Sequence, residues 1–363
     1  MSVDLILYEK QGSQTKIALL EEGSLREIEI IDEAKPTEGN IYSGKIVEKL
    51  TLANDRIGFL VNIGFEQLAF MNAKEEDGFT EGQAIVVQIS QEGRQEKGAK
   101  VTTELQFVGS CLVYCPFKAG IQVSQKIANN KEVEAKKSLV EKEIKEGEGW
   151  ILRTAIANAD DEEVLAEMQY LRDSYKDTQE KIEKAKSPSL LKVKDNSLFE
   201  YVSKYQDSLE KIITNVRKLE ETFEVEISKE PFKDYGIEDA ISEALLPYAK
   251  LPSGGRVHFE ETRACVCIDV DSSEDNGAGT ISSLNIEAAI EIAKQVKLRN
   301  LSGKIVIDFA GQSEYRYLKP AIVALQKELR LDATRTFGLN LSQVGLVEFI
   351  RQRKRASLKD SLA

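Results

Sequence analysis

The last hundred residues contain an apolar strand, a helix and a second apolar strand in succession, and this pattern constrains the fold more than any other stretch. The strands are predicted around Ala264 to Val270 and over Ile305 to Phe309. Apolar residues at helical spacing predict a helix from Ile286 to Leu298, with Asn285 as its N-cap. A right-handed crossover of this kind places the two parallel strands side by side, so their carboxyl ends meet at one edge of a sheet.

An aspartate stands at the end of each of these strands. Asp269 and Asp308 each close an otherwise apolar run, where a charge is costly unless something compensates it. Asp271 follows two residues after Asp269, and side chains two apart on a strand share a face. Magnesium would compensate these carboxylates and activate a water for attack on a phosphodiester. From the pattern alone, a role as caps or turn residues stays open.

Composition excludes several other classes of protein. At 363 residues the chain is too long for one ordinary core, so we expect two to four modules. The net charge of -12 argues against broad non-specific affinity for nucleic acid, so any RNA contact must be local. No apolar run approaches the ~20 residues of a membrane helix, and the N-terminus lacks an export signal, so a cytoplasmic location is expected.

Histidine and cysteine usage narrows the chemistry further. His258 is the only histidine, so a mechanism that uses two histidines as acid and base is excluded, and His258 is interpreted as structural. Nucleophilic serine or cysteine chemistry would need a base partner, and with a single histidine the sequence gives no case for it. The cysteines match no common zinc or redox spacing and are interpreted as buried reduced thiols: Cys111, Cys115, Cys265 and Cys267.

The rest of the sequence predicts strands over about the first hundred residues and a long helix after them. A strand meander is expected over residues 3 to 31, and short alternating strands from Gly39 to about Lys100 suggest a small barrel. Asp160 is expected to cap a long helix that runs to about Lys186. The chain is therefore expected to be α/β, in the sense of an α+β protein with several domains.

Several motifs resemble the ribonuclease E/G family in order and spacing. They extend over nearly the whole chain, and only residues 187 to 235 match poorly. The motifs are Gly39 to Ile46, Lys97 to Thr103, Leu251 to Gly255, Ile268 to Ser272, Asn285 to Ala289, Ile305 to Phe309 and Gly345 to Glu348.

The resemblance implies an RNase H-like part with an inserted RNA-binding OB-fold barrel and a 5'-sensor, followed by a DNase I-like catalytic part. The expected boundaries are 1–36 and 191–250 for the two RNase H-like segments. The barrel is expected over 37–104, the sensor over 105–190 and the catalytic region over 251–363.

The resemblance also implies roles for individual residues. Asp269 and Asp308 match two magnesium-binding catalytic aspartates, and Asp271 stands where the family has a supporting asparagine. The extra charge of Asp271 could tighten metal binding or raise a neighbouring pKa. A pocket for a 5'-monophosphate matches Gly109, Val113, Arg153, Thr154 and Arg335, and arginine reads phosphate oxygens well.

In the barrel, lysines could meet phosphates and aromatic rings could stack on bases, although ordinary packing stays an alternative for each ring. The candidates are Tyr42, Lys45, Phe59, Phe70 and Lys97, of which Phe70 and Lys97 match positions that the family uses. A basic cluster between Arg351 and Arg355 could track the RNA backbone or form a solvated helix face.

The sequence therefore leaves two functions open. One is a magnesium-dependent endoribonuclease that cuts single-stranded RNA in processing or decay and senses a 5'-monophosphate. The other is an RNA-binding protein with weak or no cleavage, which Asp271, the acidic balance and a short segment between Ser272 and Asn285 would favour. The family's Cys-Pro-x-Cys zinc link is absent, so zinc is not expected and a homodimer would need another interface.

Overall fold

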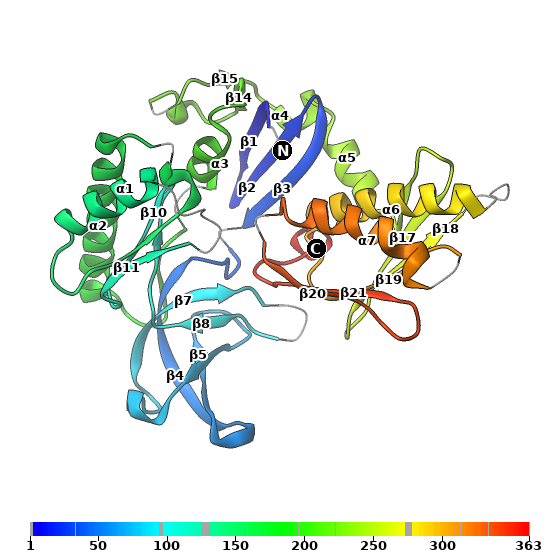
Figure 1. Cartoon of the computed structure of the whole chain (residues 1–363). Helices are drawn as coiled ribbons and strands as arrows, with labels where there is room; N and C mark the ends of the chain where they lie inside the picture. Colours follow the sequence, from blue (N-terminus) through cyan, green and yellow to red (C-terminus); the bar gives the residue numbers. More distant parts are fainter. Residues whose placement is uncertain are drawn as a thin grey trace. The chain divides into compact units, whose positions relative to one another are not determined.

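The chain forms two compact units, Met1–Ile31 with Ser208–Ala363 and Asp32–Asp207. The computed structural model describes residues 3–32, 34–93, 97–124, 131–157, 159–194, 197–221, 223–272, 278–311, 314–332 and 334–362. The first unit is discontinuous in sequence, because the second is inserted between its two segments (Figure 1).

The N-terminal meander is present and belongs to a five-stranded sheet of the first unit. Its strands are β1 (Leu5–Gln11), β2 (Gln14–Glu21) and β3 (Ser24–Asp32). The later strands β14 (Lys211–Thr214) and β15 (Glu226–Ile227) extend it in the order β15-β14-β1-β2-β3, with β14 parallel to β1. Apolar residues of three short helices share its core: α4 (Pro231–Asp234), α5 (Ile237–Ala244) and α8 (Leu358–Leu362).

A second sheet of this unit contains the predicted strand-helix-strand pattern. Its strands run in the order β16-β17-β18-β19-β21-β20, and β18 and β19 are parallel, as predicted. The strands are β16 (Tyr248–Lys250), β17 (Arg256–Glu261), β18 (Val266–Asp271), β19 (Gly303–Asp308), β20 (Thr336–Leu341) and β21 (Val347–Arg351). The helices α6 (Ala278–Leu298) and α7 (Tyr315–Leu329) pack on one face of the sheet (Figure 1).

The prediction of Asn285 as an N-cap was wrong. Helix α6 begins at Ala278, so Asn285 lies inside it and is buried. Its side-chain amide donates to the carbonyl oxygen of Ala310 at 2.9 Å and its oxygen accepts from the Ala310 N–H at 3.1 Å. Asn285 therefore holds the loop that leaves β19, and this use of its side chain depends on tertiary packing that a capping pattern does not report.

The second unit begins with the predicted small barrel. Strands β4 (Ile41–Thr51), β5 (Ile57–Asn62), β6 (Ala69–Ala73), β7 (Ala84–Gln91) and β8 (Lys100–Thr102) form it. The order β4-β5-β6-β8-β7 closes through a β4–β7 pairing, which makes a closed five-stranded barrel consistent with an OB-like fold. Short 3-10 helices η1 (Ala53–Asp55) and η2 (Glu75–Asp77) lie in its loops.

A four-stranded sheet with two helices completes the second unit. The sheet is β11-β12-β10-β9, made of β9 (Phe107–Val108), β10 (Leu112–Cys115), β11 (Gly120–Val123) and β12 (Gly149–Leu152). Helices α1 (Lys131–Glu143) and α2 (Asp161–Lys184) accompany it, and Asp160 caps α2 in a capping box with Glu163, as the sequence predicted for its start. The remaining elements are η3 (Thr154–Ala157), β13 (Ser189–Lys192), α3 (Ser197–Tyr205) and, in the first unit, η4 (Arg217–Glu221).

The segment around residue 190 stays with the second unit. Strand β13 pairs with β4 of the barrel, and α3 follows it within the same unit. The expected start of the second RNase H-like segment at residue 191 therefore falls inside a strand, and the chain returns to the first unit at Ser208.

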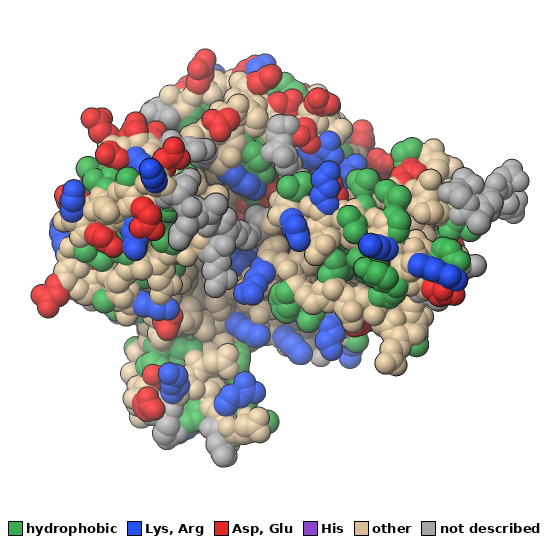
Figure 2. Space-filling model, in the orientation of Figure 1, with side chains coloured by type: hydrophobic (Ala, Val, Ile, Leu, Met, Phe, Trp, Pro, Cys, Tyr) green, Lys and Arg blue, Asp and Glu red, His purple; other side chains and the backbone are tan. Residues whose placement is uncertain are grey.

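The surface and the cysteines give two further observations. Within the described part of the chain, none of the helices combines the length and apolarity needed to cross a bilayer. Hydrophobic side chains gather on the surface over α6 and α7 (Figure 2). These helices carry the exposed apolar residues Ile290, Tyr317 and Val323. Cys111 and Cys115 are buried as predicted, but Cys265 is half-buried and Cys267 is exposed, because they alternate with the core positions of β18.

Candidate functional site

Asp269 and Asp308 are neighbours in the second sheet of the first unit. They are register partners in the parallel pair β18–β19, at the carboxyl ends of both strands. The alternation of β18 buries Val266, Ile268 and Val270 against α6 and α7 and exposes the residues between them. Both carboxylates therefore lie on the face of the sheet that these helices leave open, close to the strand ends that the sequence indicated.

Further groups on the same face shape the electrostatics. Burial raises the pKa of Asp269, the charges of Asp271 and Asp308 raise this pKa further, and His258 opposes them. His258 stands opposite Asp269 in the β17–β18 pair, and its Nε2 lies 3.2 Å from Oδ2 of Asp271. The sequence interpretation treated His258 as structural, but it lies within the carboxylate cluster. Its place in the sequence could have indicated this, because His258 and Glu260 are two residues apart on an alternating strand and therefore share the polar face.

The two carboxylates suit a hard divalent cation. Among the residues that the structure describes, no three His, Cys, Asp or Glu side chains converge to hold a metal alone. Magnesium does not require such a group, because it usually binds one or two carboxylates and keeps several waters. Burial, and after it the charges of Asp271 and Asp308, raise the pKa of Asp269, and a bound cation would favour its ionised form.

Four of the five predicted sensor residues lie at one end of the β11-β12-β10-β9 sheet. Gly109 follows β9, Val113 is on β10, and Arg153 and Thr154 follow β12 directly. Arg153 donates from Nη1 to the carbonyl oxygen of Gly109, and its backbone N–H donates to the carbonyl of Cys111 at 2.8 Å. Val113 is buried, whereas Thr154 is exposed and Arg153 is partly exposed.

The fifth predicted sensor residue, Arg335, belongs to the other unit. It is exposed just before β20, with its guanidinium 5.8 Å from the ring centre of Phe337. Within the second unit, Arg153 also has an acidic partner, since its Nη2 lies 3.4 Å from Oε2 of Glu200 on α3.

Glu167 on α2 braces the loop between β9 and β10, and sequence reasoning missed it. Its carboxylate accepts hydrogen bonds from the backbone N–H groups of Cys111 and Leu112 at 3.1 and 3.0 Å and from the Cys111 thiol. A Cβ at Gly109 would lie 1.9 Å from Oε1 of Glu167, so any larger residue there would displace this carboxylate from its backbone contacts. The only signal of this role in the sequence was that Glu167, a charged residue, falls on the apolar side of a predicted helix.

The structure divides the barrel candidates into two groups. Tyr42 and Phe59 are each only 2% exposed and pack edge-on against Phe65 and Phe79, so their rings belong to the barrel core and cannot be offered to a base. Both lie on strand positions that face inward, which alternation alone could not assign before the register was known.

Phe70, Lys45 and Lys97 remain available at the barrel surface. Lys45 and Lys97 are exposed, and the Phe70 ring is half-buried on β6. The backbone N–H of Phe70 donates to the Ala99 carbonyl at 2.7 Å, which brings the Lys97 loop beside it. A Cβ at Gly98 would lie 1.9 Å from the Leu68 carbonyl oxygen, so glycine is needed for this close approach.

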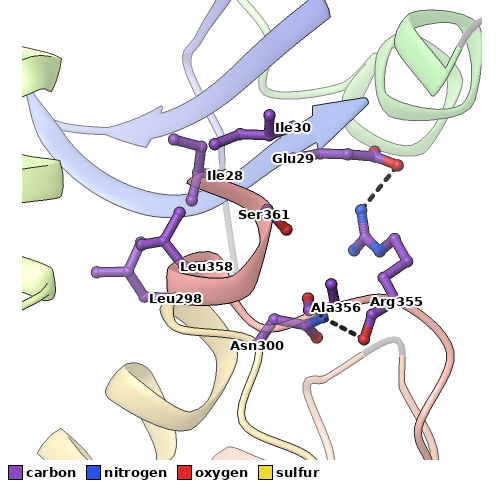
Figure 3. Close-up of a pocket in the computed structure, with 9 residues that line it drawn as sticks. All are labelled: Ile28, Glu29, Ile30, Leu298, Asn300, Arg355, Ala356, Leu358 and Ser361. Carbon is purple, nitrogen blue, oxygen red and sulfur yellow. Dashed lines mark hydrogen bonds and ion pairs between the residues drawn. The ribbon is translucent and has the colours of Figure 1, made fainter. Parts of the chain in front are cut away.

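The basic cluster near the C-terminus is not a free cationic surface. Arg351 is buried and its Nε donates to Asp332 at 2.7 Å. Arg355 pairs with Glu29 at 2.8 Å, as Figure 3 shows, and lies 3.7 Å from Glu27. The interpretation that this cluster tracks RNA is therefore wrong for these two arginines, because carboxylates distant in sequence neutralise them.

Comparison with known proteins identifies the class of protein to which this chain belongs, a family of ribonucleases. The model of the ribonuclease E/G family matches residues 106–354. Ribonuclease G of Haemophilus influenzae is 32% identical, over 96% of this chain and 79% of the relative. The chain belongs to the ribonuclease E/G family.

Two Escherichia coli proteins show how much of each relative the chain spans. Ribonuclease G is 28% identical over 96% of this chain and 80% of its own length. Ribonuclease E is 29% identical over 98% of this chain but only 37% of its own length. The chain thus spans most of a ribonuclease G and about a third of a ribonuclease E.

Proposed function

We propose that this chain is a magnesium-dependent endoribonuclease that cuts single-stranded RNA in processing or decay and prefers a 5'-monophosphate. Membership of a family of ribonucleases makes it an endoribonuclease. The observation that carries the metal assignment is the register pairing of Asp269 with Asp308 on an open sheet face. We further propose that the two sheets of the first unit correspond to the RNase H-like and DNase I-like parts.

The roles of the residues follow from their positions. Asp269 and Asp308 would hold the magnesium ion, which when bound supplies a water acidic enough to attack a phosphodiester. His258 contacts the Asp271 carboxylate and opposes the rise in the pKa of Asp269 that burial and the neighbouring carboxylates cause, which favours the ionised form of Asp269. With one histidine in the chain, no histidine pair is available to move the protons.

RNA would be held on the second unit. Phe70 can stack on one base while Lys97 meets the adjacent phosphate, because the Lys97 loop lies beside β6. At the sensor, Arg153 is partly exposed and would exchange its contact with Glu200 for a terminal phosphate. Thr154, which is exposed in the same unit, is proposed as a further phosphate donor, and Arg335 of the first unit is proposed as a phosphate-binding residue on the family resemblance alone.

The second candidate, an RNA-binding protein with weak or no cleavage, depends on Asp271. Its carboxylate raises the pKa of Asp269 and would weaken metal binding if that effect dominated. The shortened segment between Ser272 and Asn285, which also favoured this reading, lies partly outside the described residues.

The two candidates are separated by cleavage of a labelled single-stranded RNA that carries a 5'-monophosphate or a 5'-hydroxyl, with magnesium or with EDTA. Internal cuts that require magnesium and come faster from the monophosphorylated RNA support the first. Tight binding with no cuts under any of these conditions would leave only the second.

Replacing Arg153 by alanine is expected to reduce the preference for monophosphorylated over hydroxyl-ended RNA by about tenfold or more, since a hydrogen bond to a charged group contributes about 1.5–3 kcal/mol. Cleavage of the hydroxyl-ended RNA should stay nearly unchanged. The control is alanine at Arg56, an exposed arginine of the same unit. An unchanged preference in the Arg153 variant would show that the sensor assignment is wrong.

Replacing Asp271 by asparagine is expected to move the acid limb of the cleavage pH profile to lower pH. Asp269 must be ionised to bind metal, so activity falls as pH drops through its pKa, and Asp271 raises that pKa. His258 lowers the same pKa, so glutamine at His258 should move the limb to higher pH. Shifts in the same direction for both variants would contradict this electrostatic account.

A further inference from the structure

Two thiol groups lie together on the open face of β18, outside the aspartate pair. Cys265 stands just before the strand and Cys267 within it, two residues before Asp269. Their sulfur atoms are 3.7 Å apart. Cys267 is exposed and Cys265 is half-buried, whereas Cys111 and Cys115 are buried within the other unit.

The separation of the sulfurs suits two ligands of one tetrahedral cation. Thiolate sulfurs about 2.3 Å from a tetrahedral ion such as zinc stand about 3.8 Å from each other. A disulfide bond would instead bring the sulfurs to about 2.05 Å, which requires them to approach by more than an ångström. The pair can therefore take a cation without a change in the strand.

The surroundings favour a cation at this position. Glu260 is the register partner of Cys267 in the antiparallel pair β17–β18, so its carboxylate shares the open face with the thiols. Behind Cys265, the Thr262 hydroxyl donates to the Cys265 carbonyl at 2.7 Å and accepts from the Cys265 N–H at 3.1 Å. The turn that carries the first sulfur is thus held in place.

We propose that Cys265 and Cys267 form a binding site for one thiophilic divalent cation, such as Zn²⁺ or Cd²⁺, with solvent completing its coordination. Sulfur ligands select soft cations, whereas the carboxylates of Asp269 and Asp308 select hard ones, so the two sites take different ions. Residues two apart on a strand are about 7 Å apart, so a cation on the thiols would repel one at Asp269. The repulsion between the two cations rests on the proposed magnesium site, whereas the proposed thiol site does not depend on it.

The test is titration of the full chain with Cd²⁺ under reducing conditions, followed by the ultraviolet thiolate-to-metal charge-transfer band and by calorimetry. We expect one strongly bound ion per chain. Cys265→Ser and Cys267→Ser should each weaken binding by about tenfold or more, and the double variant should lose the band. All three keep Cys111 and Cys115, so the buried thiols serve as an internal control.

Two further variants separate this site from the aspartates and from misfolding. Asp269→Asn should keep the cadmium band, and Glu260→Gln should weaken binding by only a few fold. Circular dichroism should show native structure in the serine variants, because Cys267 is exposed and serine is close in size. A wild type that binds no Cd²⁺, or that binds it no more tightly than the double variant, would overturn the proposal.

Discussion

Replacing Asp308 by asparagine is expected to reduce magnesium-dependent RNA cleavage by at least ~100-fold. Groups that only support a metal's ligands are already worth about 10- to 100-fold in affinity or activity, and Asp308 would be a direct ligand. The change keeps the shape of the side chain but removes the charge that Asp269 and Asp308 together offer to a cation. Gel analysis of internal cuts at several magnesium concentrations measures the loss.

The same variant should bind single-stranded RNA almost as tightly as the wild type, because the proposed RNA contacts lie in the other unit. A matched control is Glu243→Gln, which removes an exposed carboxylate from α5 of the same unit and should leave cleavage unchanged. Near-normal cleavage by Asp308→Asn would show that the assignment of a metal site to this sheet is wrong. Loss of RNA affinity would mean that Asp308 contributes to binding and not only to chemistry.

Replacing Arg351 by methionine is expected to lower the free energy of unfolding by about 3–5 kcal/mol, because it leaves a buried carboxylate without its partner. The side chains of Arg351 and Asp332 are 3% and 6% exposed and their charged groups lie 2.7 Å apart. Arg351 also donates to the side chain of Asn300 and to the Leu301 carbonyl, at 2.8 and 3.1 Å. Denaturant unfolding followed by far-ultraviolet circular dichroism measures the change.

The control for this variant is Arg316→Met, since Arg316 and Glu314 form an ion pair whose side chains are 69% and 63% exposed. Exposed pairs contribute about 0–1 kcal/mol, so the control should unfold nearly as the wild type does. Adding Asp332→Leu to Arg351→Met should restore part of the lost stability, because no unpaired charge then remains buried. A loss below about 1 kcal/mol in the single variant would contradict the buried-pair account.

The sequence predicted the local elements of the site well, for a physical reason. Strands β18 and β19 were recognisable from short apolar runs, and their parallel pairing followed from the crossover between them. The position of Asp269 and Asp308 at both strand ends needed only this information. The barrel was likewise predictable, because its short strands with glycines at the corners differ from the rest of the chain.

Individual side chains were harder to place. Tyr42 and Phe59 were as plausible on the barrel surface as Phe70, and the register of the closed barrel decided that only Phe70 is accessible. Cys265 and Cys267 were taken as buried with the apolar strand, although alternation places them on the open face.

By itself, the sequence determined which segments form strands and helices, which family they resemble and which strand ends carry carboxylates, since these depend on residues close together in the chain. Tertiary structure alone decided that Arg351 is buried against Asp332 and that Glu167 holds the loop at Gly109. Each of these contacts depends on the environment of a side chain after folding. Burial and charge pairing join residues far apart, and no local pattern records them.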